Sequence, residues 1–514
     1  MDWSLSDDGQ SLYGLQEDGR GIAILRQSGD HGFRQLPGRR GCVNTNGSDG
    51  CQRSAALVPA QPYAGLWLFT EEHEAFLVED DVPRIRIVAF ARDRSSGALR
   101  VPVRSRCVAS TPTPACRRLI GLAAYTTVFD IQQTADGRDV YVATREAIIH
   151  LRRRPDGGLQ PIRGMAGCSG RSRVCRRTAI PAHTEFAQLQ LSDDDRNVYA
   201  TYSGHVALGG NGNVYPGAIL AFSRDPRSGS LALLAGGCLS EIHLVPSCSA
   251  LSVVHPDIED LTFASARVGY AFSQNMQDGH AALVQIQRDP LTGAIAPADT
   301  PSACWGAPDD EDGVEPLEQS RRGEPCTAIA EWKDRGLSAA PLLSADGRNV
   351  YVLSESSDNF ADLPTSYRYS SIIEFARDPA SGRLTRLSGS RDCLGALRVT
   401  SCRRLFGEYY SNAVAEAAGG RVLVLAVSAP RRGSRPAMTL HLLARDVSTG
   451  GSLTPIRGRG GCIAATPTRA CLRLRGLTAK GDLGSREPEL ETDASGKYLY
   501  VLRENVAVLR IRHG

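Results

Sequence analysis

Lysine is scarce in this sequence, and neither sign of charge dominates. Only three lysines occur, Lys333, Lys480 and Lys497, so nearly all of the basic residues are arginine. The 59 Lys and Arg residues face 56 Asp and Glu residues, which leaves a formal net charge of +3 on 514 residues. A nearly neutral chain has no general attraction to nucleic acid. We therefore expect no nucleic-acid partner.

Long apolar runs are also missing. No stretch approaches the roughly 18 apolar residues that a membrane-spanning helix needs, so we expect no transmembrane segment. The first ten residues, MDWSLSDDGQ, have neither a basic n-region nor an apolar h-region, and they do not resemble a signal peptide. With 42% hydrophobic and 22% charged residues, the chain still has the composition of a protein that buries a core.

The motifs of several enzyme classes are absent. The sequence contains no G-x-S-x-G nucleophile elbow. It also contains no G-x-G-x-x-G, Walker, H-E-x-x-H or EF-hand pattern. These absences argue against an α/β-hydrolase, the common nucleotide-binding loops and the commonest metal sites.

Cysteine, in contrast, is abundant and regularly spaced. The 14 cysteines form seven close pairs, four of them with the spacing C-x8-C. Zinc sites prefer C-x2–4-C, which no pair matches, so the spacing favours local disulfides. Disulfides persist in oxidising compartments, and we therefore expect a secreted or periplasmic protein. The expected pairs are Cys42 with Cys51, Cys107 with Cys116, Cys168 with Cys175, Cys238 with Cys248, Cys304 with Cys326, Cys393 with Cys402, and Cys462 with Cys471.

One phrase recurs along the chain. SADGRNVYV at 344–352 is related to TADGRDVYV at 134–142 and SDDDRNVYA at 192–200. An apolar strand ending in Arg-Asp follows, as in IIEFARDPASGRL at 372–384. Apolar runs bounded by Gly, Asp and Pro predict strands. Repeated units of four antiparallel strands, without a helical pattern between them, predict an all-β protein built of β-propeller blades. A solenoid is the alternative.

The units number eight, and the last stops after three strands. We expect a single propeller domain over residues 1–514, with seven blades and an overlapping closure as the alternative. The expected blades cover 1–51, 64–116, 127–175, 186–248, 258–326, 338–402, 411–471 and 487–514.

The polar residues of the repeated phrase are typical of turns. Asp346 can accept backbone N–H groups, and Gly347 can supply a positive φ. Asp378 and Gly382 have the same pattern in the outer hairpin. We interpret these residues as structural rather than catalytic.

The combination SADGRNVYV…IIEFARDPASGRL resembles the YVTN-type repeat of lactonase-like β-propellers, which include relatives of bacterial 6-phosphogluconolactonase. The resemblance covers nearly the whole chain. It implies a propeller fold and, as an activity, lactone hydrolysis at the mouth of the central channel.

The first candidate site is a set of arginines that follow the second cysteine of a pair. Arranged around a ring, they could form a belt that binds carboxylate, sulfate or phosphate groups. The alternative is ordinary solvated surface arginine. The set is Arg53, Arg117, Arg118, Arg176, Arg177, Arg403, Arg404 and Arg473.

The second candidate site is a set of acids at the start of the innermost strands. Converging carboxylates could hold Ca²⁺, or a transition metal if histidines join them. The alternative is a polar channel whose acids cap backbone groups. We expect no cofactor other than such a Ca²⁺ ion. The set is Asp2, Asp130, Asp260 and Glu489, with Glu185, Asp257, Glu259, His183 and His255 nearby.

The third set consists of aromatic residues in long insertions rich in Gly, Ser and Asn. Exposed tyrosines in such loops are typical of adaptable binding surfaces, although the rings could instead pack against their own loops. The set is Tyr202, Tyr215, Phe360, Tyr367, Tyr369, Tyr409 and Tyr410.

These observations favour a monomeric extracellular propeller that binds a glycan, a polyanion or a protein on its disulfide-bonded loops. The alternative is a lactonase-like hydrolase in which His183 or His255 is the base and Glu185 a further candidate. A third hypothesis is a structural module of a larger surface protein.

Overall fold

The structure is a computed structural model, and it describes the strands and the turns that join many of them. The described residues contain no α-helix. None of their short 3₁₀ helices is long and apolar enough to cross a membrane. The described residues are 2–6, 8, 10–15, 21–27, 33–55, 57, 65–70, 74–81, 84–101, 107–110, 116–119, 127–154, 158–170, 175–178, 184–204, 206–208, 212–214, 217–240, 248–251, 257–274, 281–298, 303–306, 326–332, 336–337, 341–358, 367–387, 393–395, 402–405, 410–417, 420–431, 434–457, 462–464, 472–473, 489–492, 498–502 and 506–510.

The described strands form eight sheets in chain order, which we number 1 to 8, and one separate hairpin. Sheet 1 contains β1 (Asp2–Leu5), β2 (Ser11–Leu15), β3 (Gly21–Gln27), β4 (Phe33–Gln35), β5 (Cys42–Asn44) and β6 (Gln52–Arg53). Sheet 2 contains β7 (Gly65–Thr70), β8 (Glu74–Asp81), β9 (Arg84–Arg92), β10 (Leu99–Arg100), β11 (Cys107–Ala109) and β12 (Arg117–Arg118). Sheet 3 contains β13 (Val128–Gln133), β14 (Asp139–Thr144), β15 (Ala147–Arg153), β16 (Leu159–Pro161), β17 (Cys168–Gly170) and β18 (Arg176–Arg177). Sheet 4 contains β19 (Thr184–Leu191), β20 (Asn197–Gly204), β23 (Ala218–Arg224), β24 (Leu231–Ser240) and β25 (Ser249–Ala250), and the hairpin is β21 (Val206–Leu208) with β22 (Gly212–Val214).

The remaining sheets follow the same plan. Sheet 5 contains β26 (Asp257–Phe263), β27 (Val268–Gln274), β28 (Ala281–Arg288), β29 (Ile295–Pro297), β30 (Cys304–Gly306) and β31 (Thr327–Ala328). Sheet 6 contains β32 (Gly336–Leu337), β33 (Leu342–Leu343), β34 (Asn349–Asp358), β35 (Tyr367–Arg377), β36 (Leu384–Arg386), β37 (Cys393–Gly395) and β38 (Arg403–Arg404). Sheet 7 contains β39 (Tyr410–Ala417), β40 (Val422–Arg431), β41 (Ser434–Asp446), β42 (Ser452–Pro455), β43 (Cys462–Ala464) and β44 (Leu472–Arg473), and sheet 8 contains β45 (Glu489–Thr492), β46 (Tyr498–Leu502) and β47 (Val506–Arg510). Short 3₁₀ turns are η1 (Gly38–Arg40), η2 (Ser48–Gly50), η4 (Gly164–Ala166), η6 (Ala330–Trp332) and η8 (Val447–Thr449).

Sheets 1 to 7 each contain more strands than the four antiparallel ones expected for each unit. In sheet 1 the fourth position is divided, because β4 and β5 both pair with β3 and η1 interrupts the chain between them. A further strand, β6, then pairs with β5 in parallel. The parallel pairing arises because the loop between the two strands returns the chain to the same end of the sheet. Sheets 2, 3, 5, 6 and 7 likewise have two strands that share the fourth position and a last strand that pairs in parallel.

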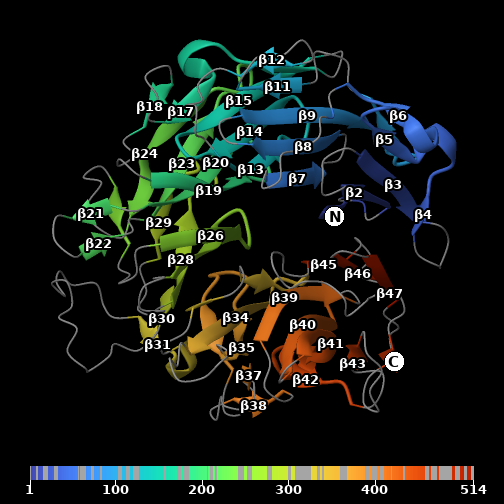
Figure 1. Cartoon of the computed structure of the whole chain (residues 1–514). Coiled ribbons are helices and arrows are strands. Elements are labelled where there is room, and N and C mark those ends of the chain that lie inside the picture. Colours follow the sequence, from blue (N-terminus) through green and yellow to red (C-terminus); the bar gives the residue numbers. More distant parts are fainter. Residues whose placement is uncertain are drawn as a thin grey trace. The chain divides into compact units, whose positions relative to one another are not determined.

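The chain divides into two compact units. Figure 1 colours the chain by residue number, from blue at the N-terminus to red at the C-terminus. Unit 1 comprises Met1–Ala200, Ala221–Leu234 and Tyr500–Val508. Unit 2 comprises Thr201–Leu220, Ala235–Leu499 and Leu509–Gly514. The number of blades and their membership of one domain stay predictions.

Within each unit, consecutive sheets pack face to face. The packing of sheet 6 explains why the residues of its VYV strand are apolar. Val350 and Val352 lie in the core between sheets 5 and 6, whereas Tyr351 and Leu353 lie in the core between sheets 6 and 7. Successive side chains of a strand point to opposite faces, and a sheet covered on both faces needs apolar residues throughout. Similar cores join sheet 1 to sheet 2 and sheet 2 to sheet 3.

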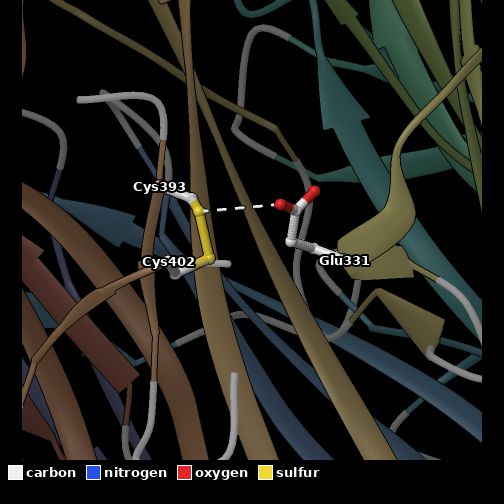
Figure 2. Close-up of side chains that lie close together, drawn as sticks. All are labelled: Glu331, Cys393 and Cys402. Carbon is white, nitrogen blue, oxygen red and sulfur yellow. Dashed lines mark hydrogen bonds between the residues drawn. A yellow bond between two sulfur atoms is a disulfide. The ribbon is translucent and has the colours of Figure 1, made fainter. Parts of the chain in front are cut away.

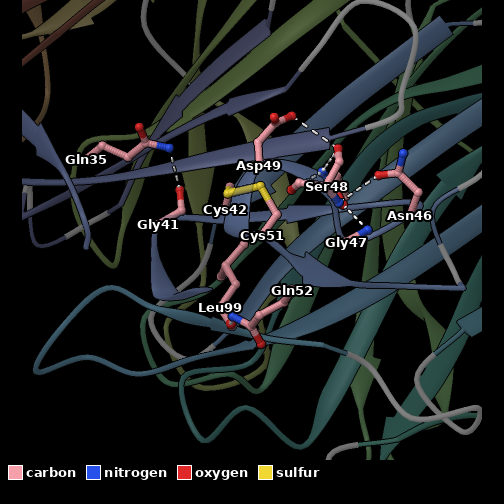
Figure 3. The surroundings of a disulfide bond; sticks show 11 residues. Gln35, Gly41, Cys42, Asn46, Gly47, Ser48, Asp49, Cys51, Gln52 and Leu99 are labelled. Carbon is pink, nitrogen blue, oxygen red and sulfur yellow. Dashed lines mark hydrogen bonds between the residues drawn. A yellow bond between two sulfur atoms is a disulfide. The ribbon is translucent and has the colours of Figure 1, made fainter. Parts of the chain in front are cut away.

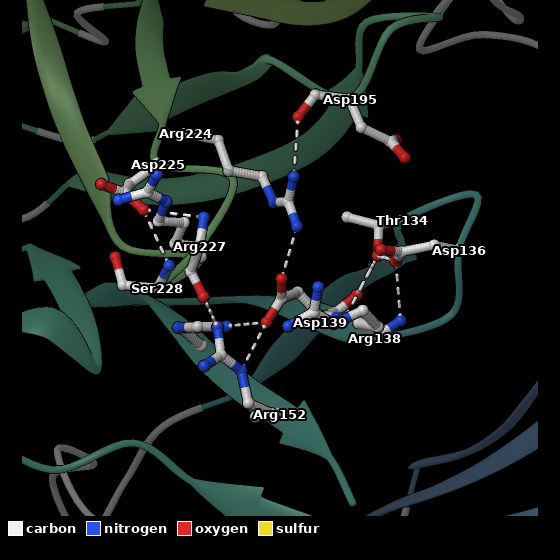
Figure 4. Close-up of polar contacts among 12 residues, drawn as sticks. Thr134, Asp136, Arg138, Asp139, Arg152, Asp195, Arg224, Asp225, Arg227 and Ser228 are labelled. Atoms are coloured by element: carbon white, nitrogen blue, oxygen red, sulfur yellow. Dashed lines mark hydrogen bonds and ion pairs between the residues drawn. The ribbon is translucent and has the colours of Figure 1, made fainter. Parts of the chain in front are cut away.

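A repeated polar contact also joins neighbouring sheets. The Tyr141 hydroxyl donates to the carbonyl oxygen of Gly229 at 2.7 Å, and Arg224 Nε donates to that hydroxyl at 2.9 Å. Arg224 also pairs with the buried carboxylate of Asp139 (Figure 4). The hydroxyl groups of Tyr13, Tyr270 and Tyr351 likewise each donate to the carbonyl oxygen of a hairpin glycine.

The turn contacts expected of the hairpin residues are confirmed. Asp346 accepts a hydrogen bond from the backbone N–H of Arg348 at 3.1 Å, and Gly347 has φ 66°. Asp378 accepts the backbone N–H of Ala380 at 2.7 Å, and Gly382 has φ 74°. Both aspartates therefore have backbone partners within their own turns.

Candidate functional site

The structure separates the predicted arginines from the predicted acids. In sheets 1, 2, 3, 6 and 7 the arginines lie on the last strand, as in β6, β12 and β18, at the outer edge. The acids lie on the first strand, as in β1, β13 and β26, at the opposite edge. In Figure 1, β12 and β18 lie on the far side of their sheets from β7 and β13. The two sets therefore cannot act on one small ligand together.

A hollow with ligand-binding chemistry lies in unit 1, between sheets 1 and 2. It has a volume of about 720 Å³. Arg39 and Arg40 come from η1, Arg53 from β6 and Arg100 from β10. Four arginines against a single aspartate make this hollow strongly basic. The remaining lining is mostly small or aliphatic, with Gln52, Asp93, Ser96, Ala98, Leu99 and Val101.

The walls of the hollow are held by hydrogen bonds and by a disulfide. The Gln52 side chain donates to the carbonyl oxygen of Leu99 at 3.0 Å, which joins sheet 1 to sheet 2. The Gln35 side chain donates to the carbonyl oxygen of Gly41 at 3.0 Å, next to the bond between Cys42 and Cys51 (Figure 3). Sheet 1 is therefore tied to sheet 2 at the hollow, and the η1 turn that carries Arg39 and Arg40 is tied to sheet 1.

The arginines of the hollow are free to bind a ligand. Arg39, Arg40, Arg53 and Arg100 are all exposed. Among the described residues, no acidic group forms an ion pair with any of them. Guanidinium groups bind carboxylate, sulfate or phosphate in a bidentate geometry.

Asp93, the acid of the hollow, is used by its own hairpin. Its Oδ1 accepts from the Ser95 hydroxyl at 2.6 Å and from the backbone N–H of Ser96 at 3.1 Å. The Ser95 hydrogen bond in particular holds the pKa of Asp93 below its ordinary value. The carboxylate is therefore held by its own hairpin rather than by the arginines of the hollow.

Arg403 differs from the other predicted arginines. Its Nη2 pairs with Oε1 of Glu374 at 3.2 Å, and the Glu374 side chain is fully buried. Glu374 also accepts the backbone N–H of Leu453 at 2.8 Å. Arg403 thus neutralises a buried charge, and it is not a free member of the belt. Arg404 and Arg473 lie on β38 and β44.

Six of the seven predicted disulfides are confirmed, with Cα–Cα distances from 4.5 to 5.0 Å. In each pair the first cysteine lies on an inner strand of the sheet, and the second lies just before the short strand at the outer edge. The bonds therefore hold the edge strands, and the cysteines are structural rather than ligand-binding. The confirmed pairs are Cys42 with Cys51, Cys107 with Cys116, Cys168 with Cys175, Cys238 with Cys248, Cys304 with Cys326, and Cys393 with Cys402.

The seventh predicted pair is only half described. Cys462 begins β43, as the first cysteine begins its strand in five of the six confirmed pairs. Its expected partner Cys471 lies outside the described residues. This disulfide stays a prediction.

A cluster of metal-ligating residue types occurs at one disulfide. Glu331 lies beside Cys393 and Cys402, and Cys393 Sγ is 4.0 Å from Glu331 Oε1 (Figure 2). Both sulfurs are bonded to each other, so neither is the thiolate that metals prefer. Glu331 instead pairs with Arg386 at 2.9 Å. This cluster is best explained as a buried ion pair packed on a disulfide.

Of the predicted acids, Asp130 has a clear structural partner. Its Oδ2 accepts the backbone N–H of Leu189 in the next sheet at 2.8 Å. The pairing register of β26 with β27 shifts just before Asp260, as the register of β13 with β14 shifts just before Asp130. Burial raises the pKa of Asp260. The metal site stays a prediction. The other acids occur on first strands: Asp2 on β1, Glu185 on β19, Asp257 and Glu259 on β26, and Glu489 on β45.

The aromatic and histidine candidates are only partly described. Tyr202 is fully buried on β20, so it cannot stack on a ligand at the surface. Tyr367 and Tyr369 lie on β35, and Tyr410 begins β39. His183, His255, Tyr215, Phe360 and Tyr409 lie outside the described residues.

The sequence reasoning missed part of the basic hollow. It identified Arg53 but not Arg39, Arg40 or Arg100. Arg39 and Arg40 are separated from Cys42 by Gly41 alone, and this pair of basic residues beside a cysteine is visible in the sequence. Arg100 belongs to the next unit of the repeat, and only the packing of sheet 2 against sheet 1 brings it to Arg53.

Comparison with known proteins gives no family for this chain. No protein-family model matches it, and no curated protein matches it. A structure titled Kuenenia stuttgartiensis hydrazine synthase has a TM-score of 0.41 and 11% identity, covering 85% of this chain and 92% of that one. Kluyveromyces lactis Hsv2 has a TM-score of 0.38 and 10% identity, covering 89% and 97%. A puromycin hydrolase has a TM-score of 0.33 and 12% identity, covering 87% and 60%. These scores are low, and no conclusion rests on them.

Proposed function

We propose that this protein is an extracellular β-propeller that binds acidic ligands without catalysis. The face-to-face packing of consecutive sheets within each unit supports the propeller. Residues Tyr500–Val508 belong to the same unit as the N-terminal 200 residues, as a closed ring requires. The six disulfides support a secreted or periplasmic location.

The hollow between sheets 1 and 2 is the proposed binding site. The single observation that carries this proposal is the convergence of four exposed arginines on a hollow of about 720 Å³. Such a site favours a ligand with two or more acidic groups, because each guanidinium can bind one of them. A volume of this size is typical of sites for small molecules or sugar units. The proposed ligand is an acidic sugar that carries sulfate or carboxylate groups.

Calorimetric titration with a sulfated disaccharide tests this proposal. The unchanged protein should bind the disaccharide at low salt, and affinity should fall as salt rises, since exposed charges are screened within about 8 Å at physiological ionic strength. The variant Arg53→Ala/Arg100→Ala should lose most of this binding. A matched control, Arg138→Ala/Arg348→Ala, removes two exposed arginines from inner hairpins and should bind normally.

Two results would contradict the proposal. Equal binding by both double variants would show that the hollow is not the site. Turnover of a lactone that His183→Ala abolishes would instead favour the hydrolase that the YVTN-type resemblance implies. A panel of lactones should therefore be assayed with the same preparations.

A further inference from the structure

The outer edge of unit 1 repeats the chemistry of the hollow. Sheets 1, 2 and 3 end in strands that carry exposed arginine, and each strand pairs in parallel with a cysteine strand. These residues, which we call the arginine edge, are Arg53, Arg117, Arg118, Arg176 and Arg177. All five are exposed, and none forms an ion pair with an acidic group of the described residues.

The same strand position is different in the following sheets. Sheet 4 ends in Ser249–Ala250, and sheet 5 ends in Thr327–Ala328. Sheet 6 again has arginine, but Arg403 is paired with the buried Glu374. Arg404 and Arg473 also occupy edge strands, in sheets 6 and 7, but their side chains lie outside the described ones. Among the side chains that the structure describes, exposed arginines without an ion pair occupy this strand position in the three consecutive sheets 1 to 3.

The spacing of the arginine edge matters for the ligand. Stacked sheets lie about 10 Å apart, and the first strands β1 and β7 are side by side on the inner side of the stack. The last strands lie at the opposite, outer edge, as Figure 1 shows for β12 and β18. Outside the hollow, one small anion can therefore reach the arginine-edge residues of only one sheet. A chain of acidic units can reach those of several.

We propose that the arginine edge binds a linear acidic polysaccharide that begins at the hollow and continues across sheets 2 and 3. This inference rests on the proposed function, because Arg53 belongs to both the hollow and the arginine edge. Each additional sheet adds a binding contact within the same ligand, so affinity rises with chain length through effective concentration.

Polysaccharide fits the edge better than nucleic acid does. Binding of single-stranded nucleic acid relies on aromatic side chains that stack with the bases, and no aromatic residue lines the hollow among the residues described. The paired cysteines also favour an oxidising compartment. Sulfate or carboxylate groups on a flexible sugar chain require only the guanidinium groups that the edge provides.

Binding of heparin oligosaccharides of defined length tests the inference. The affinity of the unchanged protein should rise by about a hundredfold from the disaccharide to the dodecasaccharide. In the variant Arg117→Ala/Arg118→Ala/Arg176→Ala/Arg177→Ala, that increase should disappear, whereas the disaccharide should still bind at the hollow. The control Arg138→Ala/Arg348→Ala should keep the full increase, and melting temperatures should verify that every variant is folded.

The outcomes separate this inference from the proposed function. Disaccharide binding without any increase with length would overturn the arginine edge and leave the hollow intact. Length-dependent binding that survives Arg53→Ala/Arg100→Ala would overturn the hollow as the place where the bound chain begins, and with it the proposed function. Equal competition by DNA of matched length would overturn the choice of polysaccharide. Absence of all binding would overturn both.

Discussion

At the scale of single residues, the buried arginines are the most informative. Arg445 is almost fully buried, and its Nη2 pairs with Asp346 at 2.7 Å and with Asn349 at 2.5 Å. Burial alone would raise the pKa of Asp346, but hydrogen bonds from Ser344 and Arg445 outweigh it and lower that pKa. The arginine of the Arg-Asp strand is thus an internal ion-pair partner, unlike the exposed Arg348.

Replacing Arg445 with alanine should destabilise the protein. The change leaves Asp346 and Asn349 without their partner, and lost hydrogen bonds to a charged group cost about 2–3 kcal/mol. Urea unfolding monitored by circular dichroism measures the loss. The control Arg348→Ala removes an exposed arginine and should change stability by no more than about 0.5 kcal/mol.

The same variant should also change the pH dependence of stability. Because the pKa of Asp346 is lowered from 3.8 in the folded state, its contribution is present above the unfolded value and is lost as the pH falls through the lowered folded one. Without Arg445 this loss on acidification should be smaller. An unchanged acid limb of the stability profile would contradict the assigned role of the pair.

At the scale of single elements, the outer hairpin needs glycine both for its turn and for its packing against the preceding sheet. Gly382 has φ 74°, which glycine adopts without strain. A Cβ atom at the same position would collide with Val268 of the preceding sheet. Gly97 likewise has positive φ and would collide with Ser11. The turn and the packing of the sheets therefore require the same residue.

The cysteine pairs give a prediction at this scale. All 14 cysteines should be oxidised in seven local pairs, including Cys462 with Cys471, because that pair repeats the C-x8-C spacing of three confirmed ones. Peptide mapping under non-reducing conditions should recover seven linked pairs. A free thiol, or a link between cysteines of different pairs, would be evidence against this assignment.

At the scale of the whole molecule, closure of the ring is the central expectation. The last three strands form a small sheet, and Tyr500–Val508 belong to unit 1. Deleting residues 490–514 should expose unpaired strand edges, which promote aggregation. Size-exclusion chromatography and thermal melting compare the truncated and full chains. A truncated protein that stays monomeric with an unchanged melting temperature would contradict the ring.

Much of this architecture could be predicted from the sequence because its determinants are local. Asp-Gly turns, apolar runs and close cysteine pairs depend on a few neighbouring residues. These local patterns were enough to predict the hairpin roles of Asp346 and Gly347 and the disulfide between Cys42 and Cys51. The split fourth position and the parallel edge strands were missed, because two- or three-residue strands have no distinct pattern.

The sequence by itself therefore determined the repeated β units and their disulfides. Only the tertiary structure decided which arginines are available to a ligand. Arg53 and Arg403 both follow a second cysteine, yet Arg53 opens onto a hollow and Arg403 neutralises buried Glu374. The difference arises because each arginine meets residues that are distant in sequence, and the charge and burial of those residues depend on how the sheets pack.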